Sequence, residues 1–257
     1  MMLTPETSFG GATLAPPPSL VAGNALFLDF DGTLTEIAPH PDEVSVIPGL
    51  GLLLAQVADR LDGRMAIISG RSLSQLEQHL GPLGIAVAGS HGGEFREAGA
   101  AEAIALAHPI APDIVQQVSD LAEELGGLLV ESKPYSVAIH YRDRPEARDR
   151  ILDVTREIAR NAGVALKSGK MVFELVMPGS DKGSAARRFM SLPAFADSLP
   201  LFAGDDMTDE DAFAVVTEFG GGGVLVGPMR ETAALWRLDG VAQVHAWLGA
   251  LVEENAL

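Results

Sequence analysis

Short apolar runs separated by amphipathic stretches dominate the first part of the chain. The runs at 25–28, 64–68 and 85–88 predict buried strands, and helices are expected at 48–61 and from about 72 to 80. Polar residues follow each strand directly. Alternating strands and helices with polar groups at the strand ends are typical of a doubly wound α/β sheet.

The pattern changes in the middle of the chain, where strand-like runs follow one another closely. The elements expected there are two alternating strands joined at Pro134, two further strands at 164–167 and 171–176, and helices at about 111–125 and 145–162. Neighbouring strands with helices packed on one face indicate a small α+β unit inserted into the larger domain.

The α/β pattern resumes near Lys182, with a helix to about residue 190, strands at 201–203 and 223–226, and a final helix at 241–251. We therefore expect a core domain interrupted by a cap. The predicted division is a loose N-terminal tail at 1–22, a core at 23–108 and 179–257, and a cap at 109–178.

Composition narrows the classes of protein that the chain can represent. Its 257 residues are 47% hydrophobic, which suffices for a sizeable core, and its formal charge of −17 argues against binding nucleic acid or anionic membranes. Cysteine is absent, which excludes disulfides and thiolate chemistry. No signal peptide or long apolar run is apparent, so we expect a soluble, cytoplasmic protein, which we take to be a monomer.

Two carboxylates follow the first strand directly. Asp29 and Asp31 lie two residues apart, and Gly32 ends the run. Residues two apart share one face of a strand, so these side chains leave the sheet edge together. They repel each other unless a cation lies between them or one is protonated, and Mg²⁺ is the oxygen-binding cation that suits the pair. The alternative is an acidic cap that ends a buried strand.

Three more strand ends or helix starts carry polar groups, namely Ser69, Lys182 and the acidic run 205–211. Each alone has an ordinary explanation, such as a turn, a solvated helix start or a charged helix N-terminus. In this order they resemble the signature of haloacid dehalogenase-like phosphohydrolases: Asp-x-Asp-Gly-Thr, a strand-end Ser or Thr, a Lys, and Gly-Asp-x-x-x-Asp.

The resemblance implies a Rossmann-like core with an inserted α+β cap of the C2B type, and phosphate-ester hydrolysis through an aspartyl-phosphate intermediate. It implies that Asp29 is the nucleophile and Asp31 the general acid and base. Ser69 and Lys182 are then expected to hold the phosphoryl oxygens.

The same resemblance implies a Mg²⁺ site at the strand ends. Its expected ligands are the carboxylates of Asp29 and Asp205 and the backbone carbonyl of Asp31. Asp209 is expected to act through water, and Asp206 is a further, ambiguous candidate.

Motifs in and around the insertion resemble trehalose-6-phosphate phosphatases, and this likeness runs from about residue 25 to 248. They are Ser-Gly-Arg at 69–71, Gly-Ser-His-Gly-Gly-Glu at 89–94, Glu-x-Lys at 131–133, His-Tyr-Arg at 140–142, and Phe-Glu-Leu at 173–175 before Pro-Gly-Ser-Asp-Lys-Gly. The resemblance implies trehalose 6-phosphate as substrate, with sugar contacts from Arg71, His91, Gly92, Glu131, Lys133, His140, Arg142 and Glu174.

Several alternatives remain open at this level. Charged residues that alternate with apolar ones in strands usually face solvent, so the cap residues can be ordinary surface positions. A sucrose-6-phosphate or mannosyl-3-phosphoglycerate phosphatase keeps the same core and differs in the lid. A phosphomutase and a non-catalytic sugar-phosphate sensor are further alternatives, although a sensor does not need a leaving-group acid at Asp31.

Overall fold

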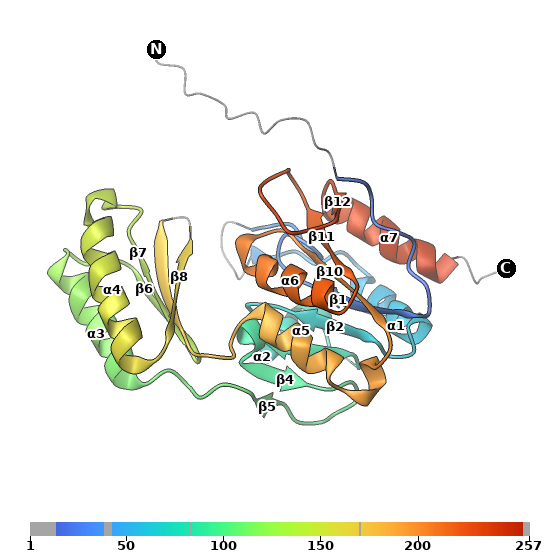
Figure 1. Cartoon of the computed structure of the whole chain (residues 1–257), viewed down its shortest axis with the longest axis horizontal. Helices are drawn as coiled ribbons and strands as arrows, with labels where there is room; N and C mark the ends of the chain where they lie inside the picture. Colours follow the sequence, from blue (N-terminus) through green and yellow to red (C-terminus); the bar gives the residue numbers. More distant parts are fainter. Residues whose placement is uncertain (1–13, 39–42, 83, 170, 254–257) are drawn as a thin grey trace, which may run out of the picture.

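The computed structural model describes residues 14–38, 43–82, 84–169 and 171–253, which form a large sheet and a smaller one (Figure 1). The large sheet has the order β12-β11-β10-β1-β2-β3-β4-β5. All its pairings are parallel except those of β3 with β4 and β4 with β5. The strands are β1 (Asn24–Leu28), β2 (Met65–Ile68), β3 (Ala86–Gly89), β4 (Glu94–Arg96), β5 (Ile104–Ala105), β10 (Leu199–Gly204), β11 (Gly222–Val226) and β12 (Trp236–Leu238).

Helices cover both faces of this sheet. One face carries α1 (Leu50–Arg60), α2 (Leu73–Leu80) and α7 (Val241–Glu253), and the other carries α5 (Lys182–Met190) and α6 (Glu210–Glu218). The central strand β1 is buried along its whole length, which explains its continuous apolar run.

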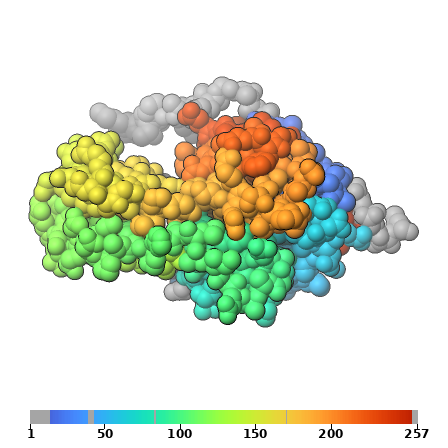
Figure 2. Space-filling model, turned by 60° about the horizontal axis from the view of Figure 1, so that its bottom comes forward, coloured from blue at the N-terminus to red at the C-terminus, as the bar shows by residue number. Residues whose placement is uncertain are grey.

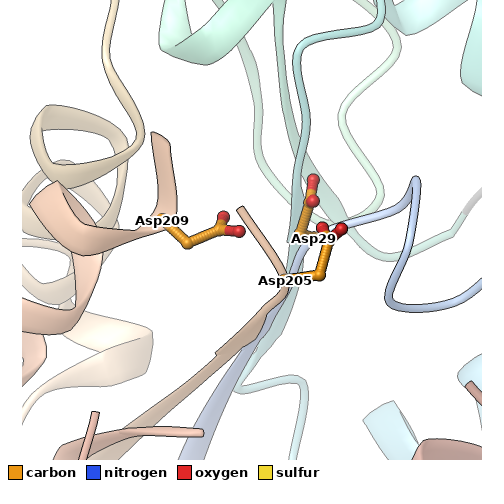
Figure 3. A group of neighbouring side chains, drawn as sticks. All are labelled: Asp29, Asp205 and Asp209. Carbon is orange, nitrogen blue, oxygen red and sulfur yellow. The ribbon is translucent and has the colours of Figure 1, made fainter. Parts of the chain in front are cut away.

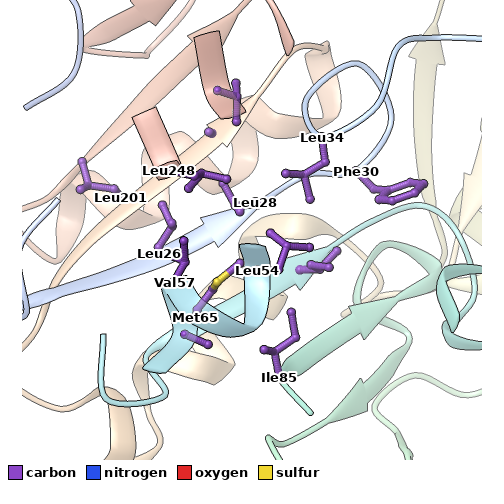
Figure 4. Packing of buried hydrophobic residues seen from close by; sticks show 14 of the residues in the cluster. Leu26, Leu28, Phe30, Leu34, Leu54, Val57, Met65, Ile85, Leu201 and Leu248 are labelled. Carbon is purple, nitrogen blue, oxygen red and sulfur yellow. The ribbon is translucent and has the colours of Figure 1, made fainter. Parts of the chain in front are cut away.

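Alternate residues of β1 enter different hydrophobic clusters. Leu26 and Leu28 pack toward α1 and α7, as Figure 4 shows. Phe27 points the other way and stacks on Phe189 of α5, with ring centroids 5.8 Å apart. Each fully buried Leu or Phe stabilises the fold by about 1.5–3 kcal/mol. The carboxyl end of β1 is therefore anchored from both sides of the sheet.

The inserted unit is an antiparallel sheet with the order β6-β7-β9-β8. Its strands are β6 (Val130–Lys133), β7 (Ser136–His140), β8 (Ala165–Gly169) and β9 (Val172–Val176). The helices α3 (Pro112–Glu124) and α4 (Arg148–Ala162) pack on the face turned away from the core (Figure 1). Figure 2 shows this unit as a lobe beside the core.

The fold class expected from the sequence is confirmed: a doubly wound α/β core with an inserted α+β unit. Sequence periodicity missed β4, β5 and β12, which have only two or three residues each. The chain crosses between the units at 106–111 and 177–181. Among the helices of the described residues, none has the length and apolarity needed to cross a bilayer.

The segment 1–22 was expected to be a loose tail, but the part of it that the structure describes makes contacts with the core. Residues 1–13 lie outside the described residues, whereas Ala15 bridges Trp236 of β12 and accepts a hydrogen bond from the Arg237 backbone at 2.9 Å. The indole of Trp247 donates to the Pro18 carbonyl at 2.8 Å, and Leu20 is buried. Residues 14–20 therefore pack on the core, because Leu20 has an apolar site and the edge of β12 offers backbone partners.

Candidate active site

The carboxyl ends of three parallel strands bring the predicted core residues together. Leu28 of β1 pairs with Ala203 of β10 on one side and with Ile67 of β2 on the other, so the residues that follow these strands meet at one edge. Asp29 continues β1, and its N–H donates to the Ala203 carbonyl at 2.9 Å. Ser69 continues β2 and is buried. This is the strand-end arrangement that the sequence predicts.

A buried lysine joins two of the predicted carboxylates. Lys182, the first residue of α5, places its Nζ 2.9 Å from Asp29 Oδ1 and 2.7 Å from Asp209 Oδ1. Burial by itself lowers the pKa of Lys182, but the charges of Asp29 and Asp209 outweigh it and hold this pKa above its usual value. Lys182 is therefore a fixed positive charge beside Asp29.

Two glycines allow the carboxylates to approach the backbone. A Cβ at Gly32, whose φ is +79°, would overlap the carboxylate of Asp205, and a Cβ at Gly204 would overlap that of Asp209. The bare glycine backbone is therefore a packing surface for each acid.

Three carboxylates converge at this edge of the sheet, as Figure 3 shows. Oxygens of Asp29, Asp205 and Asp209 all lie within 4.8 Å of one another. Burial, followed by the charges of Asp206 and Asp209, raises the pKa of Asp205 to about 7. Burial also raises the pKa of Asp29 well above its usual range, in spite of Lys182. Three acids around one ammonium fit a hard dication, which would favour their ionised forms.

The four acids differ in how many of their carboxylate oxygens already accept hydrogen bonds from the protein. Asp209 Oδ1 accepts from Lys182, and its Oδ2 accepts from the Asp206 N–H at 3.0 Å. Asp206 Oδ1 accepts from the backbone N–H and hydroxyl of Thr208, and Asp206 thereby caps the short 3₁₀ turn η5 (Met207–Asp209). Asp29 and Asp205 are therefore better placed than Asp206 or Asp209 to bind a metal directly.

Asp31 forms a close pair with another predicted residue. Arg71 Nε lies 2.7 Å from Asp31 Oδ2, and Arg71 Nη2 lies 2.8 Å from Asp31 Oδ1. This fork-shaped pair fixes both position and orientation of the carboxylate. The sequence predicted that Arg71 contacts the sugar. In the structure its guanidinium also donates two hydrogen bonds to Asp31.

The loop after β3 packs beside the site through the 3₁₀ turn η2 (Ser90–Gly92). His91 has φ +56°, and its ring lies against Gly70, where a Cβ would come within 2.6 Å of Nε2. Burial, followed by the charges of Lys182 and Lys133, lowers the pKa of His91 to about 3, so its ring is neutral near pH 7. Gly92 packs against the start of α5, and a Cβ there would lie 2.9 Å from the Asp181 carbonyl.

The open face of the cap sheet carries four of the eight predicted sugar-binding residues. Glu131 and Lys133 of β6 lie on this face, with Nζ and Oε1 3.3 Å apart, and His140 Nε2 lies 3.5 Å from Glu131 Oε2. In β9, Glu174 accepts from the Ser136 hydroxyl at 2.6 Å. Arg142 is exposed beyond the end of β7.

A cavity of about 370 Å³ joins this cap face to the core. It brings two of the cap residues opposite Asp31 and Arg71. The cavity is lined by Asp31, Ile37, Ala38, Val44, Gly70, Arg71, Gln75, Glu131 and Lys133.

Sequence reasoning missed two polar residues of the cap face. Ser136 orients Glu174, and Lys167 of β8 reaches across to the core, where its Nζ lies 3.0 Å from Asp211 Oδ2. The cross-strand register places Lys167 directly beside Glu174. Lys167 lies on the same face of the sheet as Glu174. The alternation of residues along each strand could have indicated this only if the pairing of β8 with β9 had been known.

The fold is of the haloacid dehalogenase-like class. A solved haloacid dehalogenase-like hydrolase from Bacteroides thetaiotaomicron has this fold, with a TM-score of 0.62 at 17% identity over 89% of this chain and 98% of its own.

More specific similarity comes from the trehalose-phosphatase family, whose model matches residues 27–242. Trehalose-6-phosphate phosphatase of Escherichia coli (strain K12) is 39% identical over 237 residues, which are 91% of this chain and 89% of that protein. The C-terminal domain of the Candida albicans trehalose-6-phosphate phosphatase superposes with a TM-score of 0.75 at 25% identity, covering 91% of this chain and 94% of that domain. The chain belongs to the trehalose-phosphatase family and is a phosphoric monoester hydrolase.

Proposed function

We propose that this protein hydrolyses trehalose 6-phosphate to trehalose and phosphate, with Asp29 as nucleophile. The carrying observation is that Asp29 lies buried beside Lys182, while the neighbouring Asp31 opens on a cavity shared with Glu131 and Lys133 of the cap. A phosphate ester at the strand ends would thus have its sugar beneath the cap.

The reaction has two steps on the chain's own residues. An oxygen of Asp29 attacks phosphorus, the bond from phosphorus to the sugar oxygen breaks, and protonated Asp31 gives its proton to that oxygen. In the second step Asp31 accepts a proton from water, and this water attacks phosphorus of the aspartyl phosphate. The bond between phosphorus and the Asp29 oxygen breaks, phosphate leaves, and both side chains return to their starting protonation states.

Ser69 and Lys182 are the residues we assign to the phosphoryl oxygens, because both lie buried at the same edge of the sheet. We assign Mg²⁺ to Asp29, Asp205 and the backbone carbonyl of Asp31, with Asp209 holding Lys182 in place and Asp206 capping the turn. When bound, this ion would supply positive charge for the developing charge of the transition state.

The cap residues are assigned to the disaccharide. Glu131 and Glu174 suit sugar hydroxyl donors, and Lys133 suits hydroxyl or phosphate oxygens. The remaining proposed contacts are Arg71, His91, Gly92, His140 and Arg142. Sucrose 6-phosphate and mannosyl-3-phosphoglycerate are the alternative substrates, because they would use the same core.

The decisive experiment is phosphate release across a panel of trehalose 6-phosphate, sucrose 6-phosphate, glucose 6-phosphate and mannosyl-3-phosphoglycerate, with and without Mg²⁺. Metal-dependent preference for trehalose 6-phosphate supports the whole proposal. Metal-dependent preference for another ester would overturn the assignment of the cap and retain that of the core. A monomeric state and a cytoplasmic location remain predictions, which light scattering and cell fractionation would test.

A further inference from the structure

Arg71 makes polar contacts on two sides of its guanidinium. Nε and Nη2 face Asp31, and Nη1 lies 3.2 Å from Nε2 of His79, on α2. The guanidinium also lies over the Phe30 ring, with Cζ 5.6 Å from the ring centroid. The side chain is nearly fully buried, so these contacts hold it in one place.

The contact with Arg71 determines which ring nitrogen of His79 carries the proton. A guanidinium has donors and no acceptor, so Nε2 of His79 must accept and the ring proton must be on Nδ1. Phe30 also packs against this imidazole, with ring centroids 5.9 Å apart. His79 and Phe30 thus contact the Arg71 guanidinium at positions that Asp31 does not use, and hold it in its orientation toward Asp31.

The alignment matters because the Asp31 side chain is 37% exposed and faces the cavity. Within the described part of the chain, Arg71 is the hydrogen-bond partner of this carboxylate. A carboxylate accepts in about four directions, so the Arg71 fork leaves room for a proton transfer while setting where that proton lies. Any shift of Arg71 is passed directly to Asp31.

We propose that His79 is a positioning residue for hydrolysis, which orients Asp31 through Arg71. This inference rests on the proposed role of Asp31 as general acid and base. In the described part of the chain, the polar and ring contacts of His79 are with Arg71 and Phe30, not with the cap residues assigned to the sugar. His79 therefore acts on the proton-transfer geometry and leaves the cap's contacts with the sugar in place. The competing explanation is that His79 only satisfies a buried guanidinium and contributes to stability.

Three variants separate these explanations. His79→Leu and His79→Phe remove the acceptor, and the second keeps a ring beside Phe30. His79→Gln keeps an acceptor, because its Oε1 reaches about as far as Nε2. Gln78→Leu changes an exposed neighbour on the same helix and is the matched control.

We expect His79→Leu and His79→Phe to lower kcat about tenfold, within the roughly hundredfold that a 1 Å misplacement can cost. KM for the preferred sugar phosphate should stay within about twofold, and His79→Gln should recover most of kcat. In an Arg71→Lys background, which lacks the fork, His79→Leu should have almost no further effect.

The proposal is overturned if kcat of the folded His79→Leu and His79→Phe proteins equals that of the parent while only the melting temperature falls. It is also overturned if His79→Gln is as slow as His79→Leu, or if the effects of His79→Leu and Arg71→Lys multiply. Asp31→Asn tests the underlying assignment separately: if that variant retains full turnover, the proposed function fails, whatever the His79 variants do.

Discussion

The carboxylate of Asp205 lies against the bare Cα of Gly32, in the space that a Cβ would fill. This contact joins the loop after β1 to the loop after β10. It holds an acid of the second loop close to Asp29 of the first, which brings their oxygens within metal-binding range.

A methyl group at Gly32 tests this contact. Gly32→Ala should displace Asp205 and lower kcat/KM by about a hundredfold or more, because the acids no longer meet. Gly63→Ala is the control, since Gly63 has the same φ of +79° and no atom within 4 Å of the place that its methyl group would take. Backbone strain of about 1–2 kcal/mol applies to both variants, so only the first should lose activity and Mg²⁺ binding in calorimetry. Equal activities would contradict the prediction.

Replacing Asp31 tests the assignment of the general acid. Asp31→Asn should lower kcat by about 10²- to 10⁴-fold, because the amide cannot transfer the proton to the leaving sugar oxygen. Binding of the phosphate ester should survive, since Asp29, Lys182 and the cap are unchanged. Stopped assays and isothermal calorimetry measure the two quantities. Persistent turnover would show that the proton comes from elsewhere.

The raised pKa of Asp205 predicts how the metal-free protein responds to pH. Its pKa rises from 3.8 to about 7 on folding, so between these values the folded state holds a proton that the unfolded state has lost. The contribution of Asp205 to the free energy of unfolding should therefore fall as the pH rises from about 4 to 7, whereas the lowered pKa of His91 acts in the opposite direction. Melting temperatures without Mg²⁺ test this. Relative to Asp205→Asn, in which the His91 contribution is the same, the parent should lose melting temperature as the pH rises over this window. A difference between the two proteins that stays constant with pH would contradict the prediction.

Metal addition should reverse that loss of stability. At pH 7.5, Mg²⁺ at about 100 times its Kd should stabilise the protein by about 2.7 kcal/mol. The gain should be much smaller in Asp205→Asn. An equal gain in both proteins would place the metal elsewhere.

The cap assignment predicts a loss that depends on the substrate. Glu131→Ala should lower kcat/KM for the preferred sugar phosphate by about tenfold to a hundredfold, as expected for about 1.5–3 kcal/mol from a charged hydrogen bond. Hydrolysis of p-nitrophenyl phosphate should hardly change, because that ester lacks the sugar. Glu124→Ala is the control on α3, where Glu124 pairs with Arg150. Equal losses on both esters would argue that Glu131 acts on the core.

Much of the strand-end geometry could be predicted from the sequence. Parallel strands end at one edge, so Asp29, Ser69 and Asp205 had to meet once the α/β alternation was recognised. The long helices α3 and α4 were also predictable, because their buried apolar residues recur at helical spacing. The three-residue strands β4 and β12 are too short to show a period, so their pairing could not be predicted.

Side-chain pairing was harder to predict. Arg71 and Asp31 are 40 residues apart, and their fork-shaped contact depends on rotamers that the pattern does not encode. His79 looked like an ordinary polar residue of an amphipathic helix. Lys167 stands between Leu166 and Ser168, where a lysine usually faces solvent, and its contact with Asp211 arises because the cap lies beside the core.

The N-terminal segment that packs on the core has a consequence for behaviour in solution. By bonding to Arg237 and bridging Trp236, Ala15 occupies backbone positions that an outer strand would leave open to another chain. The opposite margin of the sheet ends in β5, which is only two residues long. Open strand edges recruit strands from other molecules. Both edges of the large sheet are thus poor templates for pairing with a strand of another molecule. We therefore expect the large sheet not to extend from one molecule to the next.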